Sequence, residues 1–107
     1  MAAVKRQAPP KTRQEALKML ANAPDDKVFW VRDGKVIRNL NELANALATM
    51  SEETFTYHCN AAKCDFTNWV RDVIGDLKLA DDLVAVTRVQ AMDRVSRRVS
   101  WWQDRAG

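Results

Sequence analysis

The chain has 107 residues, and its 17 Lys and Arg exceed its 14 Asp and Glu to give a formal net charge of +3. This length is room for one domain, and 47% hydrophobic with 29% charged residues is an ordinary globular composition. No apolar run approaches the roughly 20 residues that span a bilayer, which excludes a membrane protein. A cytoplasmic protein is expected, because the first residues contain no apolar secretory segment and two cysteines cannot build a disulfide framework.

Residues 1–11 are predicted to form a flexible basic tail. They contain too few apolar side chains to offset the loss of chain entropy on ordering. Pro9 and Pro10 also oppose helix formation there. The basic residues of this tail are Lys5, Arg6 and Lys11. The folded part is therefore expected to be a single helical domain over residues 12–107.

The first helix is expected to begin at Thr12 and to end before Pro24. Thr12 and Glu15 have the spacing of a capping box, in which each side chain satisfies the other residue's free amide. Proline then ends the helix because it lacks an amide proton and clashes with the preceding turn. The face predicted to be buried contains Leu17, Leu20 and Ala21.

A β-hairpin is predicted at about residues 28–38. Two short apolar runs, residues 28–31 and 36–37, flank Asp33 and Gly34. Asp-Gly between apolar runs is typical of a two-residue type I′ turn. Because an isolated two-stranded hairpin is marginal in water, it is expected to lie against the helices.

Three further helices are predicted in the middle of the chain, each with a capping residue before its apolar repeat. Asn39, Ser51 and Asp65 are the predicted N-caps, and Gly75 is placed to end the third helix in a left-handed conformation. The apolar faces predicted from the spacing are Leu40, Leu43, Leu47 and Met50; Phe55, His58 and Cys59; and Phe66, Trp69, Val70, Val73 and Ile74.

The last helix is predicted to run from about Asp76 to about Gln103, which gives a mainly α fold of about five helices with one short hairpin. It carries two apolar stripes: Leu79, Leu83 and Val86, then Met92, Val95, Val99 and Trp102. At 1.5 Å per residue such a helix is roughly 40 Å long and overhangs a small domain. The second stripe therefore needs a cover, either the first helix or a second copy of the protein.

Between about residues 29 and 83 the sequence has a distinctive pattern: Asp33-Gly34, Ile37, Leu40, Glu42-Leu43, Leu47, Met50, Phe55, Tyr57-His58, Asp65-Phe66, Asn68-Trp69-Val70, Asp72-Val73, Gly75-Asp76 and Leu79-Ala80. In this pattern the chain resembles a small uncharacterised domain family of archaeal and bacterial hypothetical proteins. The resemblance implies a helical fold with a small hairpin and implies no particular activity. Cys59 and Cys64 depart from the residue types expected at those positions, which argues against a family metal site.

His58, Cys59 and Cys64 raise two chemical hypotheses, zinc binding with Asp65 and a Cys–His nucleophile. Structural zinc sites use paired cysteines at shorter spacing, and adjacent residues on a helix diverge by about 100°. A thiol nucleophile also needs an oxyanion site, and no Gly-rich turn is present to form one. Small buried thiols are therefore predicted, with no catalytic residue, no metal and no cofactor.

His58, Asp65 and Trp69 are predicted to form a structural lock. An imidazole on an inner helix face needs a hydrogen-bond partner, which the carboxylate supplies, while the indole packs one turn away. The alternative is a small polar pocket that binds a ligand.

The predicted function is a small non-enzymatic interaction module that binds itself, as a homodimer, or another protein through its last helix. Gly-rich phosphate loops and nucleophile elbows are absent from the sequence. Tryptophan with arginine near the end of a helix is typical of interface hot spots. The candidate interface residues are Val95, Val99, Trp101 and Trp102.

The alternative function is binding of DNA or RNA. The basic excess lies at the two ends: residues 1–27 carry six positive and three negative side chains, residues 79–107 five and four, and the middle six and seven. Guanidinium groups beside aromatic rings suit phosphate contact and base stacking. The candidate residues are Lys5, Arg6, Lys11, Arg94, Arg97, Arg98 and Arg105.

Overall fold

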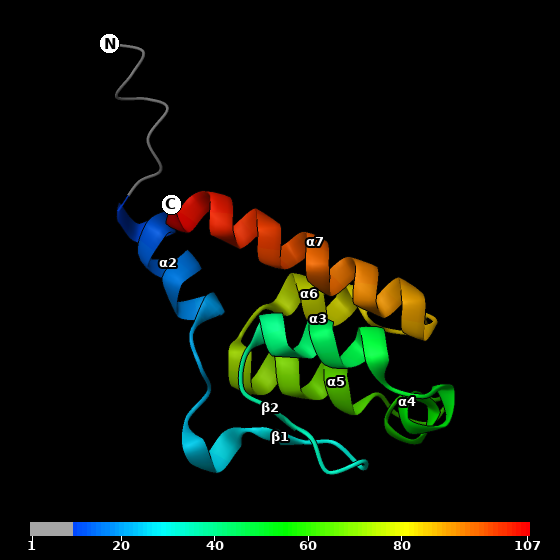
Figure 1. The fold of residues 1–107 in the computed structure, drawn as a ribbon. Helices are drawn as coiled ribbons and strands as arrows, with labels where there is room; N and C mark the ends of the chain where they lie inside the picture. Colours follow the sequence, from blue (N-terminus) through cyan, green and yellow to red (C-terminus); the bar gives the residue numbers. More distant parts are fainter. Residues whose placement is uncertain (1–9) are drawn as a thin grey trace.

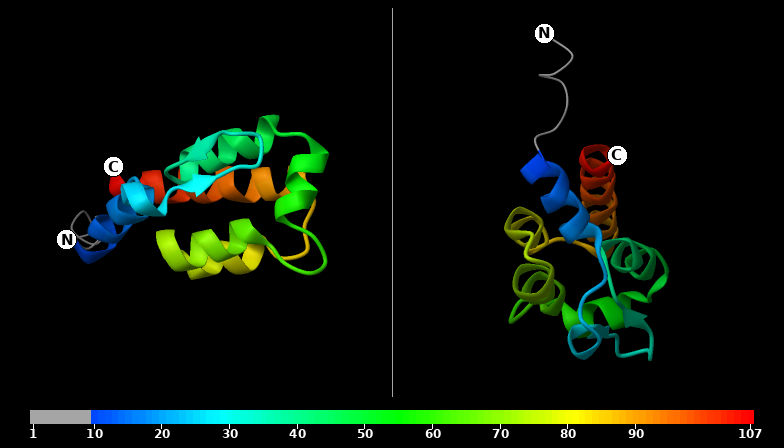
Figure 2. Two further views of the ribbon diagram at one scale, coloured as in Figure 1. Left: turned by 90° about the horizontal axis from the view of Figure 1, so that it is seen from below. Right: turned by 90° about the vertical axis from the view of Figure 1, so that its left-hand side faces the viewer.

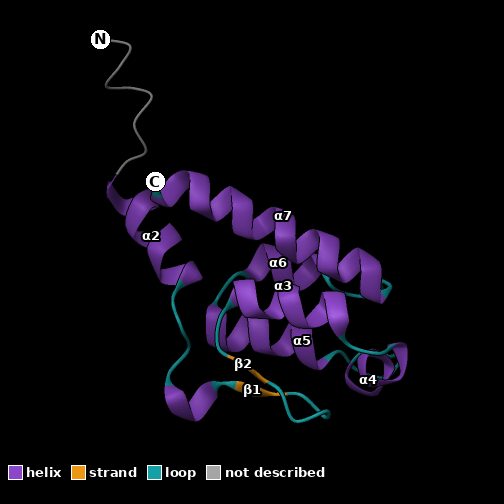
Figure 3. Ribbon diagram, in the orientation of Figure 1, coloured by secondary structure: helices purple, strands orange, loops and turns teal. Residues whose placement is uncertain are grey.

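The computed structural model describes residues 10–107, which contain six α-helices and one two-stranded antiparallel sheet (Figures 1 and 3). The mainly helical fold with a short hairpin and a long C-terminal helix is confirmed. No helix in this part of the chain combines the length and apolar content needed to cross a membrane. In chain order the elements are α2 (Pro10–Leu20), a 3-10 turn (Asp25–Lys27), β1 (Phe29–Trp30), β2 (Val36–Ile37), α3 (Leu40–Thr49), α4 (Glu52–His58), α5 (Asp65–Trp69), a π-helical segment (Val70–Ile74), α6 (Leu77–Asp82) and α7 (Arg88–Ala106).

Helix α7 lies along one side of the molecule and packs against α3, α2 and α6 (Figures 1 and 2). Its inner stripe is Ala91, Val95, Val99 and Trp102, all buried. The second apolar stripe of the last helix is therefore covered within the chain, and α2 supplies part of the cover. The largest fully buried side chains are Phe66, Ile37, Leu40, Leu43, Leu47, Leu79, Leu83, Val70 and Val95.

The start of α2 differs from the predicted start. The helix begins at Pro10, so Thr12 lies inside it and is not the N-cap. Proline is favoured in the first turn, where its missing amide proton would have no helical partner. The last two residues of the predicted tail, 10 and 11, are thus helical, and residues 1–9 lie outside the described part of the chain. Of the face predicted to be buried, Leu17 and Ala21 are exposed and Leu20 is partly buried. The buried residues in α2 and in the segment just after it are Ala16, Met19 and Ala23.

The hairpin is present, but its turn is longer than the predicted two-residue turn. Phe29 pairs with Ile37, and the amide of Gly34 donates to the carbonyl of Val31 at 2.8 Å. Gly34 has φ +97°, whereas Asp33 does not have the positive φ that a type I′ turn requires. This is a three-residue loop closed by a glycine bulge, in which only the last residue needs the left-handed conformation.

Two of the three predicted N-caps in the middle of the chain are confirmed. Asn39 and Ser51 each accept a hydrogen bond from the amide three residues later. Asp65 is instead the first residue of α5, which leaves its carboxylate free for other partners. Gly75 ends the π-helical segment with φ +92°, as predicted for a left-handed cap.

The predicted last helix is broken into α6 and α7. Ala85 has φ +57°, which interrupts helical geometry between them. Thr87 then starts α7 in a capping box with Gln90, each side chain accepting a hydrogen bond from the other residue's amide. α7 alone is roughly 28 Å long at 1.5 Å per residue, shorter than the roughly 40 Å of the predicted continuous helix.

Candidate functional site

His58 and Asp65 are joined in the way predicted for the structural lock. His58 Nδ1 lies 3.1 Å from Asp65 Oδ2, and the backbone amide of Arg32 donates to His58 Nε2 at 3.0 Å. Because Nε2 accepts this bond, the proton of the neutral ring sits on Nδ1 and is donated to the carboxylate. The His58 residue is 5% exposed, and both ring nitrogens are used by the protein.

Trp69 does not complete the lock in the predicted manner. Phe29 takes the place next to the imidazole, with ring centroids 5.1 Å from His58 and 6.1 Å from Trp69. The indole of Trp69 donates to the carbonyl of Lys27 at 2.8 Å and so joins α5 to the 3-10 turn that precedes the hairpin.

Asp65 also accepts a hydrogen bond from Lys63 Nζ at 2.9 Å. Burial opposes ionisation of Asp65, but the hydrogen bonds from Lys63 and His58 and the positive charge of Lys63 outweigh it, so the pKa of this carboxyl is lowered. The carboxylate is therefore held ionised between two partners.

Cys59 and Cys64 form a disulfide, and the prediction of buried free thiols is wrong. The two cysteines face each other in an isolated antiparallel bridge between the end of α4 and the start of α5. This juxtaposition depends on the turn between them, which their sequence spacing does not specify. Within residues 10–107, no three His, Cys, Asp or Glu residues are grouped closely enough to hold a metal ion.

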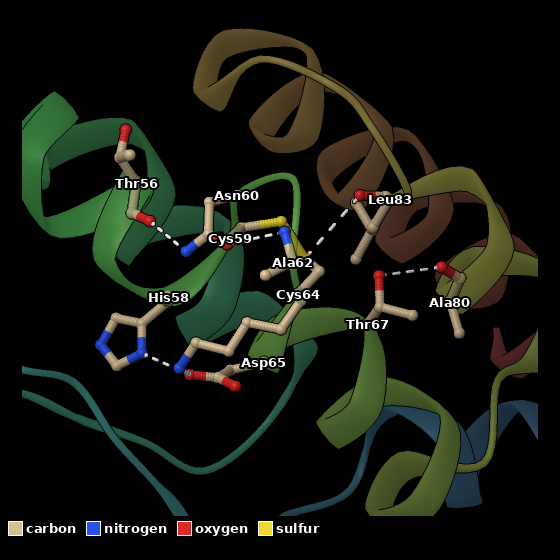
Figure 4. The surroundings of a disulfide bond; sticks show 11 residues. Thr56, His58, Cys59, Asn60, Ala62, Cys64, Asp65, Thr67, Ala80 and Leu83 are labelled. Atoms are coloured by element: carbon tan, nitrogen blue, oxygen red, sulfur yellow. Dashed lines mark hydrogen bonds and ion pairs between the residues drawn. A yellow bond between two sulfur atoms is a disulfide. The ribbon is translucent and has the colours of Figure 1, made fainter.

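Beside the disulfide lies a hollow of about 430 Å³, here called the loop hollow. It opens between the loop from Cys59 to Cys64 and the α6–α7 loop, and Figure 4 shows the disulfide next to Leu83, which precedes the second loop. Its volume is within the range of ligand-binding pockets. The residues that line it are Cys59, Asn60, Ala61, Ala62, Lys63, Cys64, Thr67, Asn68, Val84, Ala85 and Val86.

The two loops around the loop hollow are held by contacts at its base. Thr67 Oγ1 donates to the carbonyl of Ala80 at 3.2 Å, which joins α5 to α6 (Figure 4). Cys64 Sγ lies 3.9 Å from the carbonyl oxygen of Leu83; this is a packing contact, since a disulfide sulfur has no proton to donate. Ala85, on the second loop, is the only non-glycine residue with positive φ in the described chain. Such a conformation costs about 1 kcal/mol or more for a residue with a Cβ.

Three of the four candidate interface residues are in the core. Val95, Val99 and Trp102 are buried against the rest of the chain and are not available to a partner. Trp101 is 38% exposed on the outer side of α7. The guanidinium carbon of Arg98 lies 4.3 Å from its ring centroid and that of Arg105 lies 3.4 Å away. These positions are one turn before and one turn after Trp101, so base stacking on this ring requires displacing a guanidinium group.

Asp76 is the centre of a buried polar network between α6 and α7. Its carboxylate accepts from Arg98 Nε at 2.7 Å, Arg98 Nη2 at 3.0 Å and Trp102 Nε1 at 2.7 Å, and it also caps α6 through the amide of Leu79. Burial opposes ionisation of Asp76, but the bonds from Arg98, Trp102 and the backbone, with the Arg98 charge, lower its pKa. Arg98, a candidate for nucleic-acid binding, is therefore also a structural residue that joins α7 to Asp76.

The remaining candidates for nucleic-acid binding are partly engaged within the chain. Arg94 Nη1 donates to the carbonyl of Asp82 at 2.7 Å, and Arg97 Nε pairs with Asp93 at 2.9 Å. Arg105 donates to the carbonyl of Trp101 as well as lying over its ring. Lys5, Arg6 and the side chain of Lys11 lie outside the described part.

The loop hollow is the feature that sequence reasoning missed. Its walls come from two loops whose approach depends on the break before α7. The signal for that break was available: Thr87 and Gln90 have the spacing of a capping box, although they lie inside an otherwise helical pattern.

Comparisons of the chain with protein-family models, with curated proteins and with solved structures find no match.

Proposed function

We propose that this protein is a non-enzymatic interaction module that receives an apolar side chain of a protein partner in the loop hollow. The observation that carries the proposal is the combination of a 430 Å³ space with small apolar walls, provided by Ala61, Ala62, Val84, Ala85 and Val86. Hot-spot side chains of protein partners insert into pockets of this kind.

The exposure of the rim favours a protein side chain over a free small molecule. Val84 is 55% exposed, and Ala61, Ala62 and Ala85 are also exposed. Small-molecule sites bury most of the ligand surface, whereas a protein surface brings further apolar contacts that cover such a rim. Docking a partner here removes from water apolar area that the chain itself leaves uncovered.

The side chains best suited to catalysis, the histidine and the two cysteines, already have structural roles, which supports a binding function over an enzymatic one. His58, the only histidine of the chain, uses both ring nitrogens within the fold. The two cysteines are bonded to each other and supply no thiolate. The proposed surface therefore differs from the one expected from the sequence, since the inner stripe of α7 is occupied by its own chain.

Two exposed valines give a matched test of this proposal. Val84 lines the loop hollow, whereas Val89 has nearly the same exposure, 53%, on the first turn of α7 outside it. N-acetyl-leucinamide stands in for a partner's side chain, and its binding is followed by two-dimensional NMR of the isotope-labelled protein. Saturable shifts at the amides of Ala62 and Ala85 are expected.

Val84→Asp is expected to weaken probe binding at least about fivefold, because it places a charge in the apolar wall. Val89→Asp is expected to leave binding unchanged. Binding that is absent from the wild-type protein, or that responds equally to the two substitutions, would contradict the proposal. Thermal unfolding of both variants establishes that each remains folded.

A further inference from the structure

We infer that a second site, on the outer face of α6 and α7, binds a phosphate group. A hollow of about 250 Å³ lies between the two helices and is here called the basic hollow. It is separate from the loop hollow, with which it shares no lining residue. Its lining is four cationic side chains, one carboxylate and one indole: Lys78, Arg94, Arg97, Arg98, Asp82 and Trp101.

Two of the four cations are already fixed in position. Arg94 is anchored by the bond from Nη1 to the carbonyl of Asp82, which leaves Nε and Nη2 free to donate. Arg98 is anchored through Nε and Nη2 to the buried Asp76, which leaves Nη1. Guanidinium groups held in place lose less entropy when they bind an anion, and their planar donors match phosphate oxygens.

The other two cations are held only by exposed ion pairs. Lys78 pairs with Asp82 at 2.9 Å, and Arg97 pairs with Asp93 at 2.9 Å, each across one helical turn. Exposed pairs of this kind contribute about 0.3–0.5 kcal/mol, so a bound anion can replace them at little cost. Arg94 has no carboxylate within 4.0 Å among the described residues, whereas the other three cations each pair with one. The unpaired positive charge of Arg94 therefore attracts an anion.

The ligand class follows from the donors and the space. Several N–H groups from fixed guanidiniums, a mobile ammonium and a volume of about 250 Å³ suit a phosphate or diphosphate group. The indole of Trp101 adds an apolar wall but already carries guanidinium groups over its ring, so the site recognises the phosphate rather than a stacked base.

The test is a calorimetric titration with inorganic pyrophosphate and, separately, with a short oligothymidylate, each at low and at physiological ionic strength. Arg94→Gln is expected to weaken binding about tenfold, because it removes charged donors to the anion. Asp82→Asn is expected to strengthen binding several-fold, since it removes the one carboxylate of the hollow and releases Lys78 while keeping the backbone carbonyl. Arg38→Gln, a surface substitution outside the hollow, is expected to change nothing.

The gain expected for Asp82→Asn keeps the test decisive even if Arg94→Gln disturbs the fold. Binding of pyrophosphate alone identifies a free or small phosphorylated compound as the source of the phosphate. Binding of the oligonucleotide with the same dependence on Arg94 and Asp82 identifies a nucleic acid. No saturable binding of either probe, or binding that ignores both substitutions, would overturn the inference.

Discussion

At the scale of single residues, Asp76 has more side-chain hydrogen bonds than any other residue in the described part of the chain. It is 2% exposed, and its carboxylate accepts hydrogen bonds from Arg98, Trp102 and the first turn of α6. Removing one partner of such a buried pair leaves the other uncompensated, which costs about 3–5 kcal/mol. Asp76 therefore couples α6 to α7 and fixes Arg98 at the edge of the basic hollow.

The lowered pKa of Asp76 predicts how the stability of the protein changes at acid pH. Because its pKa is lowered in the folded state, it adds stability at pH values above its unfolded pKa, about 3.9, and this stability is lost as pH falls through the folded pKa. The lowered pKa of Asp65 acts in the same direction. Urea unfolding at a series of pH values should show constant stability near neutrality and a decline below about pH 4.

Asp76→Asn should lower the free energy of unfolding at neutral pH by about 3 kcal/mol and flatten the acid decline. Asp72→Asn, which changes an exposed carboxylate paired with the adjacent Arg71, should leave both nearly unchanged. An acid decline as steep in Asp76→Asn as in the wild-type protein would show that other carboxylates produce it.

The second prediction at this scale concerns His58. His58→Ala removes hydrogen bonds to Asp65 and Arg32 and leaves a cavity among aromatic rings. A loss of about 2 kcal/mol, and a melting temperature lower by several degrees, is expected by calorimetry. Thr56→Ala, on the exposed side of the same helix, is the control. A melting temperature unchanged by His58→Ala would contradict a structural role for the imidazole.

At the scale of the elements, local sequence signals were reliable for residues that cap the end of an adjoining helix. Asn39 and Ser51 cap their helices as predicted, and Gly75 takes its left-handed conformation. The hairpin register and the role of Asp65 could not be derived in this way. Asp-Gly suits more than one turn, and the Asp65 carboxylate was diverted from capping by His58 and Lys63, which only the fold places beside it.

The break between α6 and α7 overrode a helical apolar pattern. Leu79, Leu83 and Val86 have helical spacing, yet Ala85 is left-handed and Thr87 starts a new helix. The periodicity of a sequence reports which faces are apolar and does not exclude a sharp turn between two helices that share the pattern.

The strain at Ala85 gives the third prediction. Ala85→Gly should raise the free energy of unfolding by about 0.5–1 kcal/mol, because glycine adopts positive φ without a Cβ clash. Ala48→Gly, an exposed position within α3, should lower it by about 1 kcal/mol. Urea unfolding of both variants measures the two effects, and a loss of stability in Ala85→Gly would contradict strain at this position.

At the scale of the whole molecule, the apolar stripe of the C-terminal helix is used to complete the chain's own core. The sequence pattern identified this stripe and one of its two alternative covers, the first helix, which the structure provides. The pattern could not show that Val95, Val99 and Trp102 are buried and so cannot contact a partner, because their burial depends on how α2 and α3 pack against α7. The two surfaces proposed to bind ligands, the loop hollow and the basic hollow, therefore lie outside this stripe.

Neither candidate site was visible as a local motif. The loop hollow is lined by residues of two separate stretches of the chain, 59–68 and 84–86, and depends on the break before α7. The basic hollow was anticipated only as a set of arginines on one helix. Its distinguishing features, the anchoring of Arg94 by the α6 carbonyl and the proximity of Lys78, come from the packing of α6 against α7.

The central claim is that an apolar side chain binds in the loop hollow and not along the stripe of α7. The most direct test is an isotope-filtered nuclear Overhauser experiment on the labelled protein with unlabelled N-acetyl-leucinamide. We expect contacts from the leucine methyl groups to the methyl groups of Ala62, Val84 and Val86, which line the loop hollow. Contacts to Val95 and Val99 instead, or no contact to any methyl group of the hollow, would contradict the claim.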